Sequence, residues 1–440
     1  MSAWPTARLR YLAEFNPTVP SYVKSASSDF PLYSMDSIHE FNAPSDPETR
    51  PVRELLYGYS YIEQTDVAYA KVTPCFENGK GLIGSDLDGP SFTTTEVTVL
   101  RPRETVDSRY LAWLLQSGVF RGPAIASMTG AGGLRRVSEP LMRDLALPCP
   151  GREMQRAVAD YLDRETAEID ALISDQQEAL ELLSSRWESE LVSCVQTGIG
   201  KETHTTDVVT WPRAPQGWRQ TRLKVTTTSV RNGAWGAEPE ADETTVRCIR
   251  VADFDKIHGS VHDRNITTRS YPATGVAESA LHPGDLILEK SGGGPTTPVG
   301  NVVRYDGAGS EMYSNFVARI EIASGVDSSY ALRLHQALYT SGVTTRSIKQ
   351  TTGIQNLDAT SYFDEPIFLP PLAEQQRIAA HLTARRNEID ELSADLTRAI
   401  ALAKERRSAL ITAAVTGQID VTAKHRPAAE QLEDDIKELT

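Results

Sequence analysis

The sequence predicts an α+β protein. Two β-rich, mixed globular domains are separated by two long helices, which pack as an antiparallel coiled coil in a pseudo-twofold internal duplication. Three observations support this prediction: motifs recur at a nearly constant offset, each half changes from a β-rich to a helical pattern at the same place, and the helical stretches keep a seven-residue apolar period. With 440 residues, the chain is long enough for two domains with separate cores, at ~100–200 residues each.

The composition fits a folded protein of a reducing compartment. Hydrophobic residues make up 40% and charged residues 24%, which is typical of globular chains. No apolar run approaches the ~18 residues of a membrane helix, and the start MSAWPTARLR lacks the apolar core of a secretory signal. The four cysteines stand far apart, which argues against disulfides or a cysteine zinc site. We therefore expect a cytoplasmic protein with no membrane partner and no metal site.

The negative charge is concentrated in two segments. The chain carries 45 Lys+Arg and 59 Asp+Glu, net −14. Residues 151–197 contribute 4 basic and 11 acidic groups, and residues 418–440 contribute 3 and 6. The two β-rich stretches are close to neutral. DNA binding is not excluded, because phosphates respond to the local surface before a distant tail.

The sequence contains an internal duplication. Several short motifs return in the same order at an offset near 220 residues, a pattern that chance seldom produces. The matched pairs include Asp66–Lys71 with Asp285–Lys290, Tyr110 with Tyr330, Gln155 with Gln375, Ile169–Asp170 with Ile389–Asp390, and Thr197–Gly198 with Thr416–Gly417.

Each half begins with a β-rich stretch. Segments such as TTTEVTVLRP (93–102) and NVVRYDG (301–307) combine β-branched residues with Gly and Pro turns. The predicted organisation is a first domain at 1–149, a first long helix at 150–198, a linker at 199–216, a second domain at 217–369, a second long helix at 370–417, and an acidic C-terminal tail at 418–440.

The last ~45 residues of each half predict a helix of roughly 65 Å. Each follows a proline and ends at Thr-Gly, where glycine can adopt the left-handed C-cap. A seven-residue apolar period keeps one seam against another helix. The predicted seam residues are Ile169, Ile173, Leu180, Leu183 and Trp187 in the first helix and Leu382, Ile389, Leu396 and Leu410 in the second. Two alternatives remain open: the stripes belong to a larger helical core, or they bind a partner.

A search for catalytic motifs finds none. The Asn/Asp-Pro-Pro-aromatic loop of adenine methyltransferases, the phosphate-binding G-x-x-x-x-G-K-[ST], H-E-x-x-H and G-x-S-x-G are all absent. Cys75 is the best nucleophile candidate, but no sequence feature supplies an activating base. The sequence therefore favours a binding protein over an enzyme, with no catalytic residue assigned.

Basic, glycine-rich turns occur at matching places in both halves and are the candidate DNA-binding segments. Glycine allows close approach to phosphate, Arg and Lys supply charge, and Gln, Asn and Arg can read base edges. One such turn alone is more often an ordinary loop, and it is the repetition that favours function. The candidate residues are Lys71, Lys80, Arg101, Gly130, Arg135 and Arg136 in the first half and Lys290, Ser291, Gly292, Arg304, Arg346, Lys349 and Gln355 in the second.

The chain resembles the specificity subunit of type I restriction–modification systems. The residues that carry the resemblance are AKVTPCFENGKG (70–81), MTG-x-x-G-x-x-RV (128–137), the two helix openings (153–173 and 369–393), and the ending RRSALITAAVTGQID (406–420). The resemblance spans both halves. One departure is the end of the first helix, SSRWESELVSCVQTG, which lacks the basic cluster of 404–407. Whether both helices bind a partner equally is therefore left open.

The resemblance implies two target-recognition domains that each read one half of a split, asymmetric double-stranded DNA site. It also implies two modification subunits docked on the helices, which carry S-adenosylmethionine and methylate adenine N6. Restriction subunits that use ATP and magnesium are an open further partner, and no cofactor is expected on this chain. Two rival hypotheses are an assembly scaffold or decoy that binds modification subunits without reading DNA, and a diverged stand-alone DNA-modifying enzyme.

Overall fold

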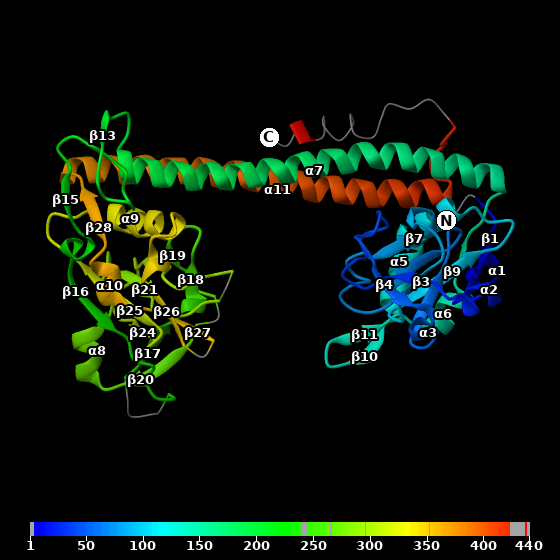
Figure 1. The fold of residues 1–440 in the computed structure, drawn as a ribbon, viewed down its shortest axis with the longest axis horizontal. Helices are drawn as coiled ribbons and strands as arrows, with labels where there is room; N and C mark the ends of the chain where they lie inside the picture. The colour runs from blue at the N-terminus through cyan, green and yellow to red at the C-terminus, as the bar shows by residue number, and fades with distance from the viewer. Residues whose placement is uncertain are drawn as a thin grey trace. The chain divides into compact units, whose positions relative to one another are not determined.

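The computed structural model describes residues 4–239, 244–264, 266–294, 296–351, 353–422 and 436–437. Most of the predicted acidic tail, 418–440, lies outside the described residues. The chain divides into two compact units: unit 1 comprises Met1–Glu178 and Asp395–Thr440, and unit 2 comprises Ala179–Ala394 (Figure 1). Each unit contains one β-rich domain and part of both long helices.

The domain of unit 1 is built on two four-stranded sheets. The first has the antiparallel order β2 (Ala13–Phe15), β9 (Val97–Pro102), β6 (Val67–Ala70), β7 (Gly81–Ile83). The second has the order β4 (Glu48–Pro51), β3 (Asp29–Tyr33), β8 (Ser91–Thr94), β5 (Tyr59–Ile62), with β3 and β8 parallel. Two further pairs are β1 (Thr6–Arg8) with β12 (Ala146–Pro148), and the hairpin β10 (Thr129–Ala131)–β11 (Leu134–Arg136). The short helices are α1 (Leu9–Leu12), α2 (Ser21–Lys24), α3 (Val52–Leu55), η1 (Gly84–Asp86), α4 (Ser108–Gln116), α5 (Gly118–Ala126) and α6 (Glu139–Asp144).

The domain of unit 2 repeats this plan. Its main sheet has the antiparallel order β16 (Thr227–Asn232), β25 (Val317–Ile322), β21 (Leu286–Glu289), β23 (Val302–Arg304). The other sheets are β20 (Thr268–Tyr271)–β17 (Thr244–Ile249)–β24 (Met312–Tyr313) and β22 (Ser291–Gly292)–β27 (Ile354–Leu357)–β26 (Ile348–Thr351). The remaining pairs are β15 (Arg219–Arg222)–β28 (Pro366–Leu369), β18 (Phe254–Asp255)–β19 (Ser260–Val261) and β13 (Thr203–Thr205)–β14 (Arg213–Pro215). The short helices are η2 (Leu223–Thr226), η3 (Val251–Asp253), α8 (Ala273–Ser279), α9 (Ser328–Thr340), η4 (Thr344–Ser347) and α10 (Ala359–Phe363).

The predicted duplication is visible in this topology. The order β2-β9-β6-β7 in unit 1 corresponds strand for strand to β16-β25-β21-β23 in unit 2. The turns before β6 and β21 are also the same. The Asp66 carboxylate accepts the backbone N–H of Glu63, and the Asp285 carboxylate accepts that of His282. The repeat read from the sequence is thus a repeat of structure.

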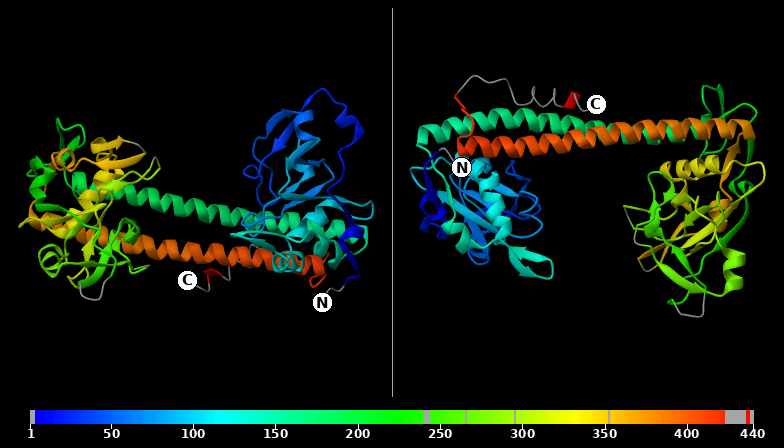
Figure 2. Two further views of the ribbon diagram at one scale, coloured as in Figure 1. Left: turned by 90° about the horizontal axis from the view of Figure 1, so that it is seen from below. Right: turned by 180° about the vertical axis from the view of Figure 1, so that it is seen from behind.

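The two long helices begin and end within two residues of the predicted limits, 150–198 and 370–417. Helix α7 spans Arg152–Thr197 and α11 spans Leu372–Thr416, and Figures 1 and 2 show them side by side. Gly198 and Gly417 both have φ +70°, the left-handed conformation that ends a helix with little strain in glycine.

Within each unit α7 and α11 pack as the predicted antiparallel pair. In unit 1, Ile169 and Ile173 bury against Ala403. In unit 2, Arg385 of α11 contacts Glu190 of α7 at 3.2 Å, and the earlier residue Arg377 reaches the carbonyl of Ile199, beyond the end of α7. The two helices therefore run in opposite directions. Among the predicted seam residues, Ile169, Ile173, Trp187, Leu382 and Ile389 are buried, and Leu180, Leu183, Leu396 and Leu410 are half-buried.

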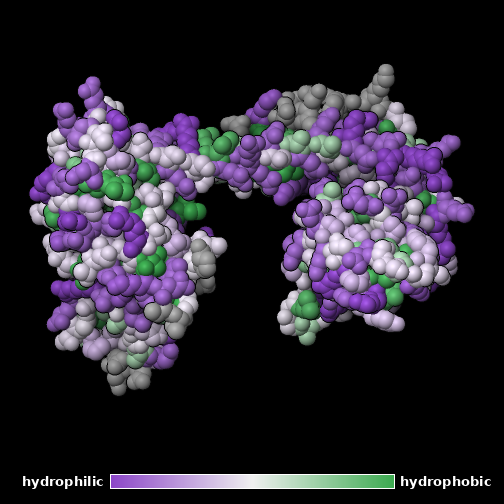
Figure 3. Space-filling model, in the orientation of Figure 1, coloured by the Kyte–Doolittle hydropathy of each residue, from purple (hydrophilic) through white to green (hydrophobic). Residues whose placement is uncertain are grey.

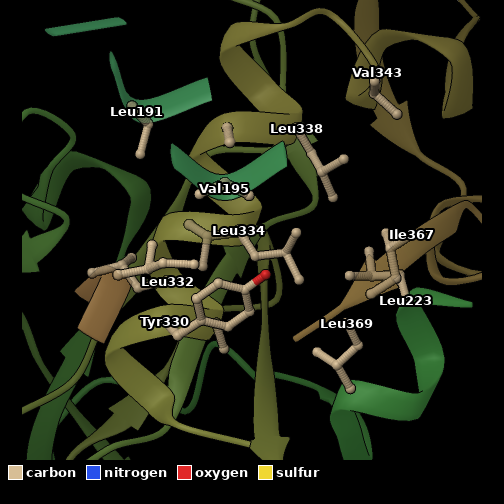
Figure 4. Packing of buried hydrophobic residues seen from close by; sticks show 14 of the residues in the cluster. Leu191, Val195, Leu223, Tyr330, Leu332, Leu334, Leu338, Val343, Ile367 and Leu369 are labelled. Carbon is tan, nitrogen blue, oxygen red and sulfur yellow. The ribbon is translucent and has the colours of Figure 1, made fainter. Parts of the chain in front are cut away.

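The helix ends also belong to the domain cores. In unit 2, Leu191 and Val195 of α7 pack beside Leu334 and Leu338 of α9 (Figure 4). In unit 1, Ile411 of α11 and Leu162 of α7 share a core with the domain. The apolar stripe therefore serves two purposes: its outer turns anchor each helix in a domain and its inner turns form the seam.

The segment predicted as a linker, 199–216, contains the β13–β14 hairpin. Trp211 between these strands is fully buried, and its ring lies 6.2 Å from that of Phe368 in β28. This connection is therefore packed into the core of unit 2.

Among the described residues, no helix combines the length and hydropathy that crossing a bilayer requires.

Candidate nucleic-acid interface

In unit 1 the structure brings the two predicted basic turns together. The backbone N–H of Thr73, in the turn 70–81, donates to the carbonyl of Arg135 at 2.9 Å, and the Thr73 hydroxyl donates to the carbonyl of Gly133 at 2.9 Å. The N–H of Arg135 returns a bond to the same hydroxyl. At Gly130 an added Cβ would lie 2.1 Å from the carbonyl oxygen of Leu134, so the hairpin requires glycine there.

The hairpin β10–β11 presents two arginines whose partners are exposed. Arg135 pairs with Glu77 at 2.7 Å and Arg136 pairs with Glu96 at 2.6 Å, and both arginine side chains are 47% exposed. The hydrogen bond and charge of Arg136 lower the pKa of Glu96. Exposed pairs of this kind contribute little stability, so a phosphate can take the place of the carboxylate. Leu134 at the hairpin tip is 46% exposed. The space-filling view shows hydrophobic surface at the free end of the β10–β11 hairpin (Figure 3).

Unit 2 presents the equivalent hairpin, β26–β27, at the same place. The N–H of Val137 donates to the carbonyl of Lys71 in unit 1, and the N–H of Leu357 donates to the carbonyl of Lys290 in unit 2. In unit 2 the contact extends into a ladder, because Ser291 pairs with Asn356 across β22–β27. The Ser291 hydroxyl donates to the side-chain oxygen of Asn356 at 2.6 Å.

The basic residues of this second hairpin remain accessible. Lys349 lies 2.5 Å from Asp358 and its side chain is 72% exposed, while Arg346 lies 3.5 Å from Glu365 and is 55% exposed. Lys290 donates to the side chain of Asn232 at 2.7 Å, and partial burial lowers its pKa. Both hairpins thus combine a glycine-containing turn with accessible basic side chains, and in unit 2 the preceding turn η4 adds Arg346, whose partner Glu365 is buried.

Four predicted site residues are held by bonds within the domains. Lys80 donates to the carbonyl of Met35 at 2.7 Å, and the buried Gln355 accepts the N–H of Val299 at 3.2 Å. Arg101 forms a bidentate pair with the buried Asp66, and Arg304 pairs with Asp306.

The two arginines also lie away from the hairpins. Arg101 is at the opposite end of β9 from Glu96, the partner of Arg136. Arg304 faces Leu286, at the far end of β21 from Lys290. Strand register places them there, and the sequence pattern does not reveal that register. The DNA-binding role of every candidate residue remains a prediction.

Sequence reasoning missed the segment that follows β16. Asn232 holds Lys290, and Trp235 nearby is 39% exposed with the guanidinium of Arg269 4.6 Å from its ring centroid. No repeated motif or basic cluster marks this segment. Its signal in the sequence is a tryptophan between Gly233 and Gly236, and the structure exposes that side chain, as is typical of surfaces that stack on bases.

Within the described residues, one group of side chains could hold a metal, although the sequence predicted none. Ligand atoms of Glu190, Cys194 and His381 lie within 4.8 Å of one another on the facing helices of unit 2. His381 and Arg385 both contact Glu190, at 3.0 Å and 3.2 Å. An arginine already neutralises this carboxylate, so pairing between the helices accounts for the cluster.

The fold is that of specificity, or S, subunits of type I restriction–modification systems. One similar chain comes from a structure describing complex assembly and conformational transition of the type I R-M system; it has a TM-score of 0.71 and 20% identity over 94% of this chain and 98% of that chain. The HsdS subunit from Thermoanaerobacter tengcongensis gives a TM-score of 0.50 and 20% identity over 94% of this chain and 97% of that one.

Sequence similarity points to the same proteins. The chain is 32% identical over 162 residues to the type I restriction enzyme EcoAI specificity subunit of Escherichia coli, and 29% identical over 162 residues to the EcoEI specificity subunit of the same organism. These matches cover 35% and 36% of this chain but only 26% and 27% of the relatives. No protein-family model matches the chain. The resemblance to type I specificity subunits that the motifs indicated is confirmed.

Proposed function

We propose that the chain is the non-catalytic DNA-sequence specificity subunit of a type I restriction–modification complex and reads a bipartite, asymmetric site. The observation that carries this proposal is the equivalence of the two hairpins. Units of the same topology present β10–β11 and β26–β27 at the same place, with different side chains on each. A duplicated scaffold with unlike reading surfaces suits two unlike half-sites.

The hairpins have the chemistry that DNA recognition needs. A two-stranded β-ribbon fits the major groove of B-DNA. Arg135, Arg136 and Lys349 hold carboxylates in pairs near the surface, which DNA phosphates can replace while releasing counterions. The guanidinium of Arg346 is also accessible, although its partner Glu365 is buried. The glycine turns allow the backbone to approach closely.

The helix pair is proposed to set the spacer between the half-sites and to dock two modification subunits. At ~1.5 Å per residue, each helix is roughly 65 Å long. Readers centred about one turn of B-DNA apart, ~34–36 Å, would contact the same face of the duplex. Acidic residues on the outer face of α7 that stay exposed, such as Glu168, Asp175 and Glu178, are candidates for a partner contact. S-adenosylmethionine, ATP and magnesium would act on the partner subunits.

Single-molecule methylation mapping of the host genome tests the proposal. We expect one split, adenine-methylated motif that disappears when this gene is deleted and returns on complementation. If methylation is unchanged by the deletion, the chain acts as a scaffold or decoy, and the specificity proposal is wrong.

Reconstitution with the modification subunits tests the division of labour. The purified chain, mixed with DNA, magnesium and S-adenosylmethionine, should neither methylate nor cleave. Adding modification subunits should give a complex of two such subunits per chain by native mass spectrometry, together with methylation of the split motif. Turnover by the chain alone would support the rival enzyme hypothesis.

A further inference from the structure

Unit 2 has a pocket of about 320 Å³ beside its candidate DNA-reading strands. Its wall includes the aromatic side chains Trp235 and Phe316, which are 39% and 45% exposed. Ser314, Glu289 and Gly293 also line it. The volume is at the lower end of ligand pockets and suits a single flat group.

The two aromatic rings are held where a planar ligand could stack. Arg269 lies over the Trp235 ring at 4.6 Å and also donates to Glu238 at 2.8 Å. Phe316 directly precedes β25 of the main sheet, and its carbonyl accepts the N–H of Lys290 at 2.8 Å. Partly exposed aromatic side chains favour stacking of bases.

Two buried polar groups lie in the same lining. Ser314 is 1% exposed, and within the described residues its hydroxyl has no hydrogen-bond partner. Glu289 is 2% exposed, and its Oε2 accepts from Lys256 at 3.3 Å and from Asn301 at 3.1 Å; neither contact uses Oε1. Buried polar groups are almost always bonded, so an unsatisfied hydroxyl in a lining that also holds a carboxylate points to a polar ligand.

The pocket opens beside the strand that pairs with the hairpin. Gly292 in β22 pairs with Gln355 of β27, and an added Cβ at Gly292 would lie 3.8 Å from Oε1 of Glu289. At Gly293, with φ +63°, an added Cβ would lie 2.8 Å from the backbone nitrogen of Val299. Glycine is therefore required at this part of the lining, where a side chain at Gly293 would collide with the backbone of Val299.

We propose that this pocket binds one base of the recognised duplex, turned out of the stack, that carries an exocyclic amino group. The inference rests on the proposed function and deepens it. The base stacks against Trp235 and Phe316, its amino group donates to Oε1 of Glu289, and a ring nitrogen or carbonyl accepts the Ser314 hydroxyl. Adenine, cytosine and guanine meet this description, because each offers an amino donor beside a ring-nitrogen acceptor, whereas thymine has no amino group.

Unit 1 has different residues at the corresponding positions. Phe316 corresponds to Glu96, because the carbonyl of Glu96 accepts the N–H of Lys71 just as Phe316 accepts that of Lys290. In unit 1 Glu96 is paired with Arg136 at 2.6 Å. The proposed extrahelical base therefore belongs only to the half-site that unit 2 reads, and the other half-site is an internal control.

A thermodynamic cycle between Trp235 and each base tests the proposal. The reconstituted complex with modification subunits is bound to a series of duplexes in which one nucleotide at a time is abasic. With intact DNA, Trp235→Ala should weaken binding about 10-fold or more, as loss of base stacking does. With the duplex lacking the bound base, the same substitution should change binding less than twofold. Ser314→Ala should show a smaller coupling at the same position.

The control is Tyr57→Ala, which removes an aromatic side chain that is 84% exposed in unit 1, and it should not couple to that position. Equal losses for Trp235→Ala on all duplexes, or coupling in the unit 1 half-site, would overturn the pocket proposal while leaving sequence-specific methylation intact. A complex that methylates no split site would instead refute the proposed function.

Discussion

The two units make the same contact where each long helix leaves its domain. In unit 1 the buried Gln155 accepts the N–H of Asp107 at 2.8 Å and donates to the carbonyl of Pro150 at 2.8 Å. In unit 2 the buried Gln375 accepts the N–H of Asp327 at 2.9 Å and donates to the carbonyl of Pro370 at 2.9 Å.

Both aspartates also cap the helix that follows them, α4 or α9. We call this arrangement the glutamine latch. It ties the first turn of the long helix to the capped helix of its own domain, and it is the same in both units.

The units differ on the reading face and at one place in the core. Arg136 on the first hairpin corresponds to Asn356 on the second, and Glu96 corresponds to Phe316. In the core, His335 and Tyr362 of unit 2 take the positions of the buried Leu115 and Met142 of unit 1. The shared latch thus belongs to the scaffold, whereas the hairpin substitutions lie where the two half-sites would be distinguished.

The largest expected effect comes from exchanging one domain. We expect that replacing residues 211–368 with the corresponding segment of another chain of this fold changes the unit 2 half-site completely and leaves the unit 1 half-site unchanged. These limits keep Trp211 and Phe368, which pack together in the core, on the same exchanged segment. Methylation mapping measures both half-sites, and a change in both would show that the units do not read independently.

The next largest effect should come from the glutamine latch. Gln155→Ala or Gln375→Ala leaves a buried N–H and carbonyls unpaired, each at about 1–3 kcal/mol. We expect the affected unit to lose about 2–4 kcal/mol, and hydrogen exchange should rise in α4 or in α9, each only in its own unit.

The matched controls for the latch are Gln177→Ala in α7 and Gln376→Ala in α11, because both side chains are exposed. They should leave exchange unchanged. If the latch variants exchange like the controls, the two glutamines do not couple helix and domain.

The sequence was sufficient to predict features that depend on local chemistry. Proline and glycine set the ends of both helices, the seven-residue period identified buried seam residues such as Ile169 and Ile389, and the repeat paired the basic turns correctly. These signals are local or periodic, so they survive without knowledge of the fold.

The features that the sequence did not reveal depend on strand register and long-range packing. Arg101 and Arg304 were grouped with the reading turns because they are basic, but their strands carry them to the other end of the sheet. Gln355 suits base recognition by type, yet it is buried and holds Val299. The pocket beside Trp235 brings together β16, β21 and β25 neighbours that are distant in sequence, and no spacing rule connects them.

The core difference between the units predicts an acid sensitivity confined to unit 2. His335 is fully buried, its Nδ1 lies 2.7 Å from the Tyr362 hydroxyl, and burial lowers its pKa from 6.5 to about 4. Between these values the unfolded chain binds a proton that the folded unit does not. The free energy of unfolding of unit 2 is therefore not reduced by His335 above about pH 6.5. Below that pH it falls by ~1.4 kcal/mol per pH unit until the pH approaches 4.

At pH 5 this loss is about 2 kcal/mol. Urea unfolding at pH 7 and pH 5 measures it, and the double substitution His335→Leu with Tyr362→Met, which installs the unit 1 pair, should remove it. His204→Gln, a change at an exposed histidine, should not. Equal acid sensitivity in the double variant would assign the effect to other groups.

The smallest expected effect concerns the charges on the hairpins. Each arginine or lysine that contacts a phosphate contributes about one unit to the salt dependence of binding. Arg135→Ala with Arg136→Ala should therefore reduce the slope of log K against log salt by up to ~2, and Lys349→Ala by ~1. In the reconstituted complex, competition with duplexes that carry base changes in one half-site distinguishes the two hairpins. A hairpin variant should lose discrimination only against changes in the half-site that its own unit reads. Lys224→Ala is the control, since Lys224 is 62% exposed but pairs with Asp364 at the end of α10. If that variant lowers the slope as much as the hairpin variants do, charge spread over the domains, and not the paired hairpins, holds the DNA.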